Sequence, residues 1–188
     1  MILPIIAYGD PILRKPCAAI ESNSPELRQL IADIFETMEN AKGIGLAAPQ
    51  IGKSIRLFVA DGNSFSDDEK HPELKGFKKV FINAQMLAET GEEWAYNEGC
   101  LSIPKIREDV NRKPVIRIRY VDENFLPHEE TFTGLAARIV QHEYDHIEGK
   151  LFTDRISPLR RTLLKRRLSD IAKGNVEVEY KMKFPRKK

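Results

Sequence analysis

Hydrophobic residues recur at helical spacing in the stretch that follows Ser24. They fall on one face of a helix and are Leu27, Leu30, Ile31, Ile34, Phe35 and Met38. Ser24 and Pro25 are typical of a helix start, because a serine side chain caps free backbone N–H groups and proline fits the first turn. Gly43 is typical of a helix end. The pattern therefore predicts a helix between Ser24 and Gly43.

Two more helices are predicted in the C-terminal half of the chain. The first begins after Gly134 and runs to about Glu148, where Gly149 ends it. The second opens at Ser157, is strongly basic and ends near Gly174. This third helix and the basic tail after it form a C-terminal region that starts at about residue 157.

Short runs of β-branched and aromatic residues predict strands. The predicted strands cover residues 56–60, 80–83, 115–120, 130–133 and 176–180. Residues 61–79 are polar and contain Gly, Asp, Ser and Pro, so we expect a surface loop there. Because strands and helices fall in separate runs and do not alternate regularly, the order favours an α+β fold.

The composition fits one domain spanning residues 1–188, since a chain of 188 residues can bury a core but is short for two domains. Charged residues make up 31% and hydrophobic residues 41%, as in a folded protein and unlike a disordered one. No stretch approaches the roughly 20 apolar residues that cross a bilayer, and the N-terminus lacks the basic leader of a secretory signal. We therefore expect a cytoplasmic location and no membrane partner.

The segment His142-Glu143-Tyr144-Asp145-His146 carries the clearest chemical signal. Histidines four residues apart on a helix project from one face and can share a metal ion. A glutamate beside the first histidine can take a proton from water without being a ligand. The alternative is an amphipathic helix with two chance histidines. The chain has only four histidines, and half of them fall in this pattern on a segment that is independently predicted to be helical.

A catalytic metal needs a third protein ligand. A long zinc-protease motif would require histidine at position 152, but Phe152 stands there, and the following helix offers no glutamate. Cys100 is the best remaining candidate, because a thiolate binds divalent ions and Gly99 permits close backbone approach. A buried, inert thiol is the alternative for Cys100, and it is the favoured interpretation of Cys17.

Three segments together resemble the signature sequences of peptide deformylases, in the order found in that family. They are Gly43-Ile44-Gly45-Leu46-Ala47-Ala48-Pro49-Gln50, Glu98-Gly99-Cys100-Leu101-Ser102 and Gln141-His142-Glu143-Tyr144-Asp145-His146. The resemblance extends from residue 10 to about residue 152. It implies a hydrolase that removes the formyl group from N-terminal formylmethionine, releasing formate. It also implies antiparallel and mixed β-sheets packed around a central helix that carries the two histidines, with a further C-terminal helix.

The resemblance implies one divalent ion held by Cys100, His142 and His146. Fe(II) is the implied physiological ion, with zinc, nickel or cobalt as substitutes, and several of these ions suit a thiolate and two imidazoles. A water or hydroxide on the metal would attack the formyl carbon, while Glu143 accepts its proton and later gives one to the departing amine. Gln50, through its side-chain amide, and Leu101, through its backbone N–H, would stabilise the oxyanion.

Further residues are expected to bind the formylmethionyl nascent peptide. By resemblance, the segment with Gly43 and Gly45 pairs its backbone with the substrate in the manner of a strand, and Gly99 and Arg107 lie near the pocket rim. Ile44, Leu135 and Ile139 are expected to form apolar walls for the methionine side chain, although the last two are also ordinary core positions on a helix. A solvated surface charge is the alternative for Arg107, and a solvated turn residue is the alternative for Gln50.

Two rival functions remain open. One is a zinc peptidase that cleaves internal peptide bonds. The other is a binding protein, suggested by basic residues in the C-terminal region: Arg160, Arg161, Lys165, Arg166, Arg167, Lys181, Lys183, Arg186, Lys187 and Lys188. Contact of that region with ribosomal RNA is a hypothesis; a solvated helix face is the favoured interpretation, because Glu177, Glu179 and Asp170 dilute the charge. No nucleotide cofactor is expected, because Gly52-Lys53-Ser54 lacks the glycine that a phosphate-binding loop would require at position 47.

Overall fold

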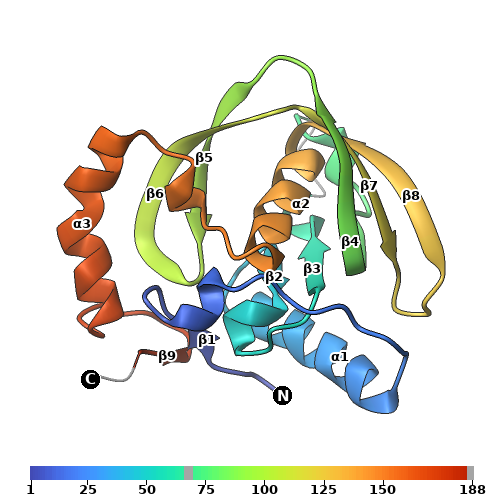
Figure 1. Cartoon of the computed structure of the whole chain (residues 1–188), viewed down its shortest axis with the longest axis horizontal. Coiled ribbons are helices and arrows are strands. Elements are labelled where there is room, and N and C mark those ends of the chain that lie inside the picture. Colours follow the sequence, from blue (N-terminus) through green and yellow to red (C-terminus); the bar gives the residue numbers. More distant parts are fainter. Residues whose placement is uncertain (66–69, 186–188) are drawn as a thin grey trace.

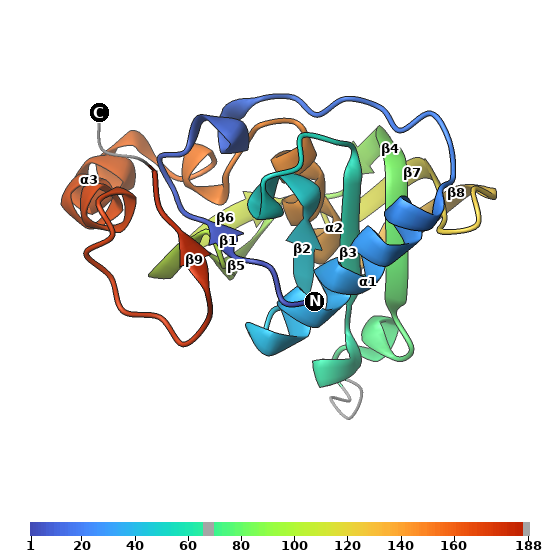
Figure 2. The ribbon, with the colours of Figure 1, turned by 90° about the horizontal axis from the view of Figure 1, so that it is seen from below.

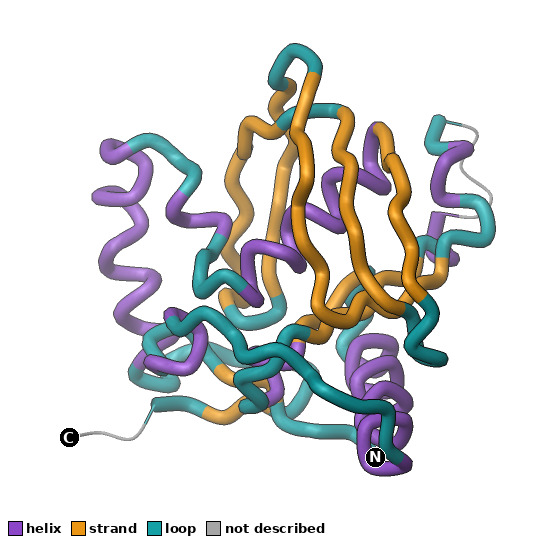
Figure 3. The backbone as a smooth tube through the Cα atoms, turned by 45° about the vertical axis from the view of Figure 1, so that its right-hand side comes forward, coloured by secondary structure: helices purple, strands orange, loops and turns teal. Residues whose placement is uncertain are grey.

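In the computed structural model, which describes residues 1–65 and 70–185, one helix lies between two layers of β-structure. This helix, α2 (Gly134–Ile147), lies between a five-stranded sheet and a two-stranded hairpin, as Figure 1 shows. The other two helices, α1 (Pro25–Asn40) and α3 (Pro158–Ala172), lie on opposite sides of the molecule (Figure 3). The predicted α+β fold with a central helix and a C-terminal helix is therefore confirmed.

The larger sheet is antiparallel, with the strand order β2-β3-β4-β7-β8. Its strands are β2 (Gly45–Ala47), β3 (Leu57–Asp61), β4 (Lys78–Thr90), β7 (Val115–Val121) and β8 (Pro127–Thr133). The hairpin consists of β5 (Trp94–Cys100) and β6 (Ile103–Arg112). A short parallel pair joins the two ends of the chain, β1 (Ile5–Ile6) with β9 (Met182–Lys183).

Helix α2 is buried on nearly all sides, which is why it occupies the centre of the fold. Its apolar residues Leu135, Ile139 and Val140 pack into a cluster with Phe58 and Phe81 of the larger sheet. The two phenylalanine rings stack with their centroids 4.6 Å apart. Because α2 is fixed from both sides, side chains on its second half have a rigid base.

All three predicted helices are confirmed, and so are the strands predicted at 56–60, 80–83, 115–120 and 130–133. The prediction missed the hairpin β5–β6. Its inward positions include the charged residues Glu98, Glu108 and Arg112, each buried. Because charged residues occupy buried positions, these strands do not show the alternation of apolar and polar residues that predicts a strand.

Two local predictions need correction. The strand expected at 176–180 is absent from that range; the chain there is irregular and bends at Glu179 and Tyr180, and the strand β9 begins only at Met182. The expected surface loop at 61–79 contributes to the core, because Leu74 and Phe77 are buried. Residues 66–69 of that loop lie outside the described residues. Among the described residues, the structure contains no helix long and apolar enough to cross a membrane.

Gly149 fixes the exit from α2 against the N-terminal segment. Its φ is +71°, and a Cβ added there would meet the carbonyl oxygen of Arg14 at 2.6 Å. Gly76 has nearly the same φ, +70°, but an added Cβ would meet nothing within 4 Å. Substitution at Gly76 would therefore introduce backbone strain alone, whereas substitution at Gly149 would add a steric clash to the same strain.

We predict that Gly149→Ala destabilises the protein at least about twice as much as Gly76→Ala, for which left-handed strain alone costs about 1 kcal/mol. Urea unfolding of both variants measures the difference. Equal losses of unfolding free energy would show that the backbone around Arg14 adapts freely.

Candidate metal and catalytic site

Three potential ligands meet beside the second half of α2. Cys100 ends β5, and His142 and His146 project from α2 one turn apart. The Cys100 Sγ and His146 Nε2 atoms are 3.3 Å apart, and the ring centroids of the two histidines are 5.1 Å apart. The ligand atoms of all three residues lie within 4.8 Å of one another. The structure thus brings together the residues that the sequence singled out.

This donor set fits a single divalent ion. One thiolate and two imidazoles gathered this closely are the donor types that bind zinc, at about 2.3 and 2.0–2.1 Å, in sites with an open position. His142 already binds Glu98 Oε2 through Nδ1, at 2.9 Å, which leaves Nε2 for the ion. A carboxylate behind a ligating histidine orients the ring and raises its basicity.

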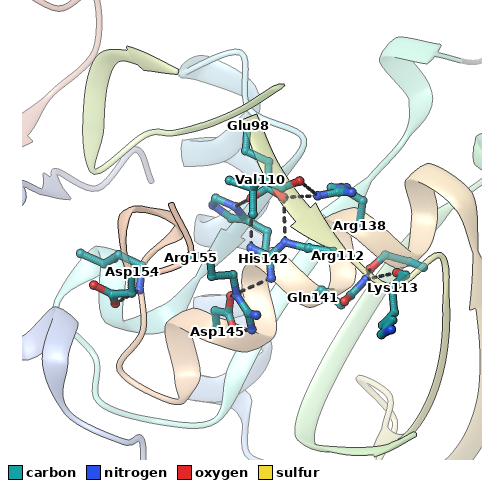
Figure 4. Close-up of polar contacts among 12 residues, drawn as sticks. Glu98, Val110, Arg112, Lys113, Arg138, Gln141, His142, Asp145, Asp154 and Arg155 are labelled. Carbon is teal, nitrogen blue, oxygen red and sulfur yellow. Dashed lines mark hydrogen bonds and ion pairs between the residues drawn. The ribbon is translucent and has the colours of Figure 1, made fainter. Parts of the chain in front are cut away.

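Glu98 is the centre of a buried ion network, shown in Figure 4. Its carboxylate accepts hydrogen bonds from Arg112 at 2.7 and 3.0 Å and from Arg138 at 2.9 Å, besides its contact with His142. Burial opposes ionisation of Glu98, but the hydrogen bonds from His142 and Arg112 outweigh it and lower the pKa of the carboxyl. Glu98 therefore stays ionised.

A second carboxylate, Asp145, extends the network along α2. Arg112 donates to Asp145 Oδ2 at 2.8 Å, and Arg155 donates to both carboxylate oxygens at 2.6 Å. The side chain of Arg112 has an exposed fraction of 0%, so water does not solvate its positive charge. Ion pairs with Glu98 and Asp145 balance that charge instead. Removing one partner from such a pair typically costs about 3–5 kcal/mol. The network therefore joins β5, β6 and α2.

Glu143 lies in the same site with an unusual environment. Burial raises the pKa of its carboxyl to about 7. Its Oε2 atom is buried and has no hydrogen-bond partner among the described residues. Gly45 lies directly against it, since an added Cβ would meet Glu143 Cγ at 2.7 Å. The absence of a side chain at Gly45 thus makes room for this carboxylate.

Gln50 is buried beside the cysteine. Its Oε1 accepts the backbone N–H of Ala47 at 2.9 Å, and this contact aims the amide nitrogen away from β2. Nε2 then donates to Ser102 Oγ at 3.2 Å and to Cys100 Sγ at 3.4 Å. The interpretation of Gln50 as a solvated turn residue is therefore wrong.

These groups face a cavity of about 880 Å³. Of the residues predicted for the site, it is lined by Gly43, Ile44, Gly45, Gln50, Gly99, Cys100, Leu101, Arg107, Leu135, Ile139, His142 and Glu143. His146 lies behind this lining and is almost fully buried. Arg107 is held at the rim, where its Nε donates to Asn97 Oδ1 at 2.8 Å.

Sequence reasoning missed several residues of the site. Arg138 lies between apolar residues on α2, and a charged residue at such a position could have indicated a buried ion pair. Glu98 begins one of the three signature segments, but its role, like that of Arg112, could not be inferred because their partners are distant in sequence. Phe65 and Tyr180 also line the cavity, although they come from segments that were predicted to be a loop and a short strand.

Comparison with known proteins agrees with this geometry. The polypeptide deformylase family model matches residues 2–162. The chain belongs to this family. It is 56% identical to the peptide deformylase of Christiangramia forsetii over 193 aligned positions, covering 100% of this chain and 98% of the relative. It is also 56% identical to the peptide deformylase of Flavobacterium johnsoniae, with 98% and 96% covered.

Solved structures show the same fold. A peptide deformylase from Legionella pneumophila superimposes with a TM-score of 0.80 at 38% identity, covering 93% of this chain and 98% of that one. Membership of the family makes the chain a metal-dependent hydrolase that acts on formylmethionine amides. The resemblance inferred from the three sequence segments is thereby confirmed.

We predict that Glu98→Gln weakens metal binding roughly 10- to 100-fold, the usual effect of losing a carboxylate behind a ligating histidine. Competition with a chelator measures the affinity. Glu108→Gln is a matched control, because Glu108 is a buried carboxylate of the same hairpin that binds Arg160 at 2.7 and 2.8 Å. Equal metal affinities in the two variants would contradict a role for Glu98 in orienting His142.

Proposed function

We propose that the chain removes the formyl group from the N-terminal formylmethionine of newly made proteins by means of Cys100, His142, His146 and Glu143. The first three hold one divalent ion, and Glu143 transfers protons. The observation that supports this most strongly is the convergence of the three ligand atoms next to a buried carboxylate oxygen without a partner among the described residues. Both lie at the wall of a cavity that is large enough for a peptide end.

The proposed ion is Fe(II), with zinc, nickel or cobalt able to replace it. When bound, a divalent ion supplies Lewis acidity, which polarises the formyl carbonyl and acidifies water.

Glu143 is the proposed general base and acid. Its buried Oε2 is the atom that accepts the proton of the attacking water and then delivers a proton to the departing amine. A carboxyl whose pKa lies near the working pH can do both. A divalent cation in the site favours the ionised carboxylate, which is the form that accepts a proton.

Gln50 and Leu101 are the proposed donors to the oxygen that gains negative charge. Gln50 Nε2 lies beside Cys100 and is held there by Ala47, so it needs little reorganisation during the reaction. Leu101 follows the cysteine directly and lines the cavity, which makes its backbone N–H the second candidate.

The substrate peptide is proposed to extend along β2. This strand is the edge of the five-stranded sheet and pairs only with β3 among the described residues, so its other edge can accept a substrate strand. The methionine side chain would pack against Ile44, Leu135 and Ile139, with Gly99 and Arg107 at the rim. We further propose that residues 1–188 act as one domain in the cytoplasm.

Ribosome contact through the C-terminal region is a separate part of the proposal. On α3, Arg160 binds Glu108, while Arg161 and Arg167 donate to backbone carbonyls of their own chain. Among the described residues, charge for binding RNA phosphates would then come mainly from Lys165 and Arg166 of α3 and from Lys181 and Lys183 of the tail. Salt-sensitive ribosome binding that survives replacement of these four residues by alanine would refute this surface.

We predict that Glu143→Gln lowers formate release from a formyl-methionyl peptide about 10²- to 10⁴-fold, as expected for loss of a general base. Metal content should be unchanged, because the ligands remain. Glu148→Gln is the control, since Glu148 lies just beyond α2 and pairs with Arg56 outside the site. If wild-type protein shown to hold metal released no formate but cleaved casein, the peptidase alternative would replace this proposal.

We predict that metal is lost as the pH falls. The cysteine must bind as thiolate and the histidines as neutral imidazoles, so affinity is present above the ligand pKa values and is lost below them. Burial lowers the pKa of His142, but hydrogen bonds with Cys100 and Glu98 outweigh it and raise that pKa. Protons should therefore compete with the metal ion for His142 as soon as the pH falls below this raised pKa. Dialysis at stepped pH followed by metal analysis measures this; constant metal content down to about pH 4 would contradict the ligand set.

A further inference from the structure

The C-terminal segment after α3 returns to the catalytic side of the molecule. It lies beyond residues 2–162, the part that the family model matches. Figure 2 shows it as a loop that turns back from α3 and reaches β9 next to β1. Backbone N–H groups of Ile5 and Ala7 donate to the carbonyls of Lys181 and Lys183, at 2.8 and 2.9 Å. These bonds fix the segment against the N-terminal strand.

Within this segment, Tyr180 contacts the residue that follows the cysteine. Its hydroxyl donates to the backbone carbonyl of Leu101 at 2.8 Å. Its ring packs with Leu101 against the core cluster that contains Leu46 and Met38. Burial raises the pKa of the Tyr180 hydroxyl, so it remains a neutral donor at physiological pH.

The turn formed by Cys100, Leu101 and Ser102 is held by separate contacts on each side. Gln50 donates to Ser102 Oγ at 3.2 Å, and the backbone N–H of Tyr8 donates to the Ser102 carbonyl at 2.8 Å. These two contacts fix Ser102. The Leu101 carbonyl is instead bound by Tyr180. The peptide plane between Leu101 and Ser102 is therefore held from the Leu101 carbonyl by the C-terminal segment.

We propose that Tyr180 is a positioning residue for deformylation, whose hydroxyl fixes the peptide plane between Leu101 and Ser102. That plane adjoins, through the Leu101 Cα, the Cys100–Leu101 peptide group that carries the Leu101 N–H, so the bond restrains the donor from the neighbouring unit. The inference rests on the proposed function, because its consequence for catalysis depends on the Leu101 N–H being a donor. It makes the C-terminal segment, outside the family-matched region, a part of the active site.

Packing of the tyrosine ring is the competing explanation for its presence at the cavity. Tyr180→Phe separates the two, because it keeps the ring and removes only the hydroxyl. Tyr120→Phe is the matched control: Tyr120 is a buried tyrosine of β7, its hydroxyl donates to Glu130 at 3.0 Å, and it lies outside the residues lining the cavity.

The experiment uses the full-length, zinc-loaded chain in three forms: wild type, Tyr180→Phe and Tyr120→Phe. Formate release gives kcat and KM, and amide NMR spectra report the resonances of Leu101 and Ser102. Chelator competition gives zinc affinity, and urea unfolding gives stability.

The expected result is that Tyr180→Phe lowers kcat roughly three- to tenfold, the size of one lost neutral hydrogen bond, with KM within about twofold of wild type. Its Leu101 and Ser102 amide resonances should shift, whereas Tyr120→Phe should change neither kcat nor those resonances. Unchanged kcat and amide resonances in Tyr180→Phe, with an active wild type, would overturn the inference alone. A wild type that releases no formate with either zinc or Fe(II) bound would overturn the proposed function instead.

Discussion

The buried carboxylate of Glu98 is the interaction on which the rest of the site depends. It binds Arg112 of β6, Arg138 of α2 and the ring of His142, while its own strand ends two residues later in Cys100. One ionised group therefore fixes the distance between the hairpin and the helix. Since buried charges are costly unless paired, any displacement of either element carries an electrostatic penalty. The three proposed metal ligands are held in place by this constraint.

The remaining catalytic groups are placed by close packing and by local hydrogen bonds. Gly45 leaves space for the carboxylate of Glu143, and Ala47 aims the amide of Gln50 at the cysteine turn. Regular elements carry the ligands, and β2 is the edge strand of the sheet beside them. This combination of a rigid metal centre and an open sheet edge suits a hydrolase that acts on the end of an extended peptide.

The sequence could predict features whose residues lie close together along the chain, but not features that depend on contacts between distant segments. The helical spacing of His142 and His146 is a property of one short segment, so these two proposed metal ligands could be singled out from the sequence alone. The partners of Glu98 are distant along the chain, and the charged inward positions of β5 and β6 disguise the hairpin as a polar region. Tyr180 gave no signal for the same reason, because its contact with Leu101 spans 79 positions.

The central claim is that one cysteine sulfur and two imidazole nitrogens bind a single ion. X-ray absorption spectroscopy of the zinc-loaded chain tests it most directly. The account predicts one sulfur at about 2.3 Å and two nitrogens at about 2.0–2.1 Å, with the sulfur lost in Cys100→Ala. A zinc shell made only of nitrogen and oxygen in the wild-type chain would contradict it, because Cys100 would then have no place in the metal centre.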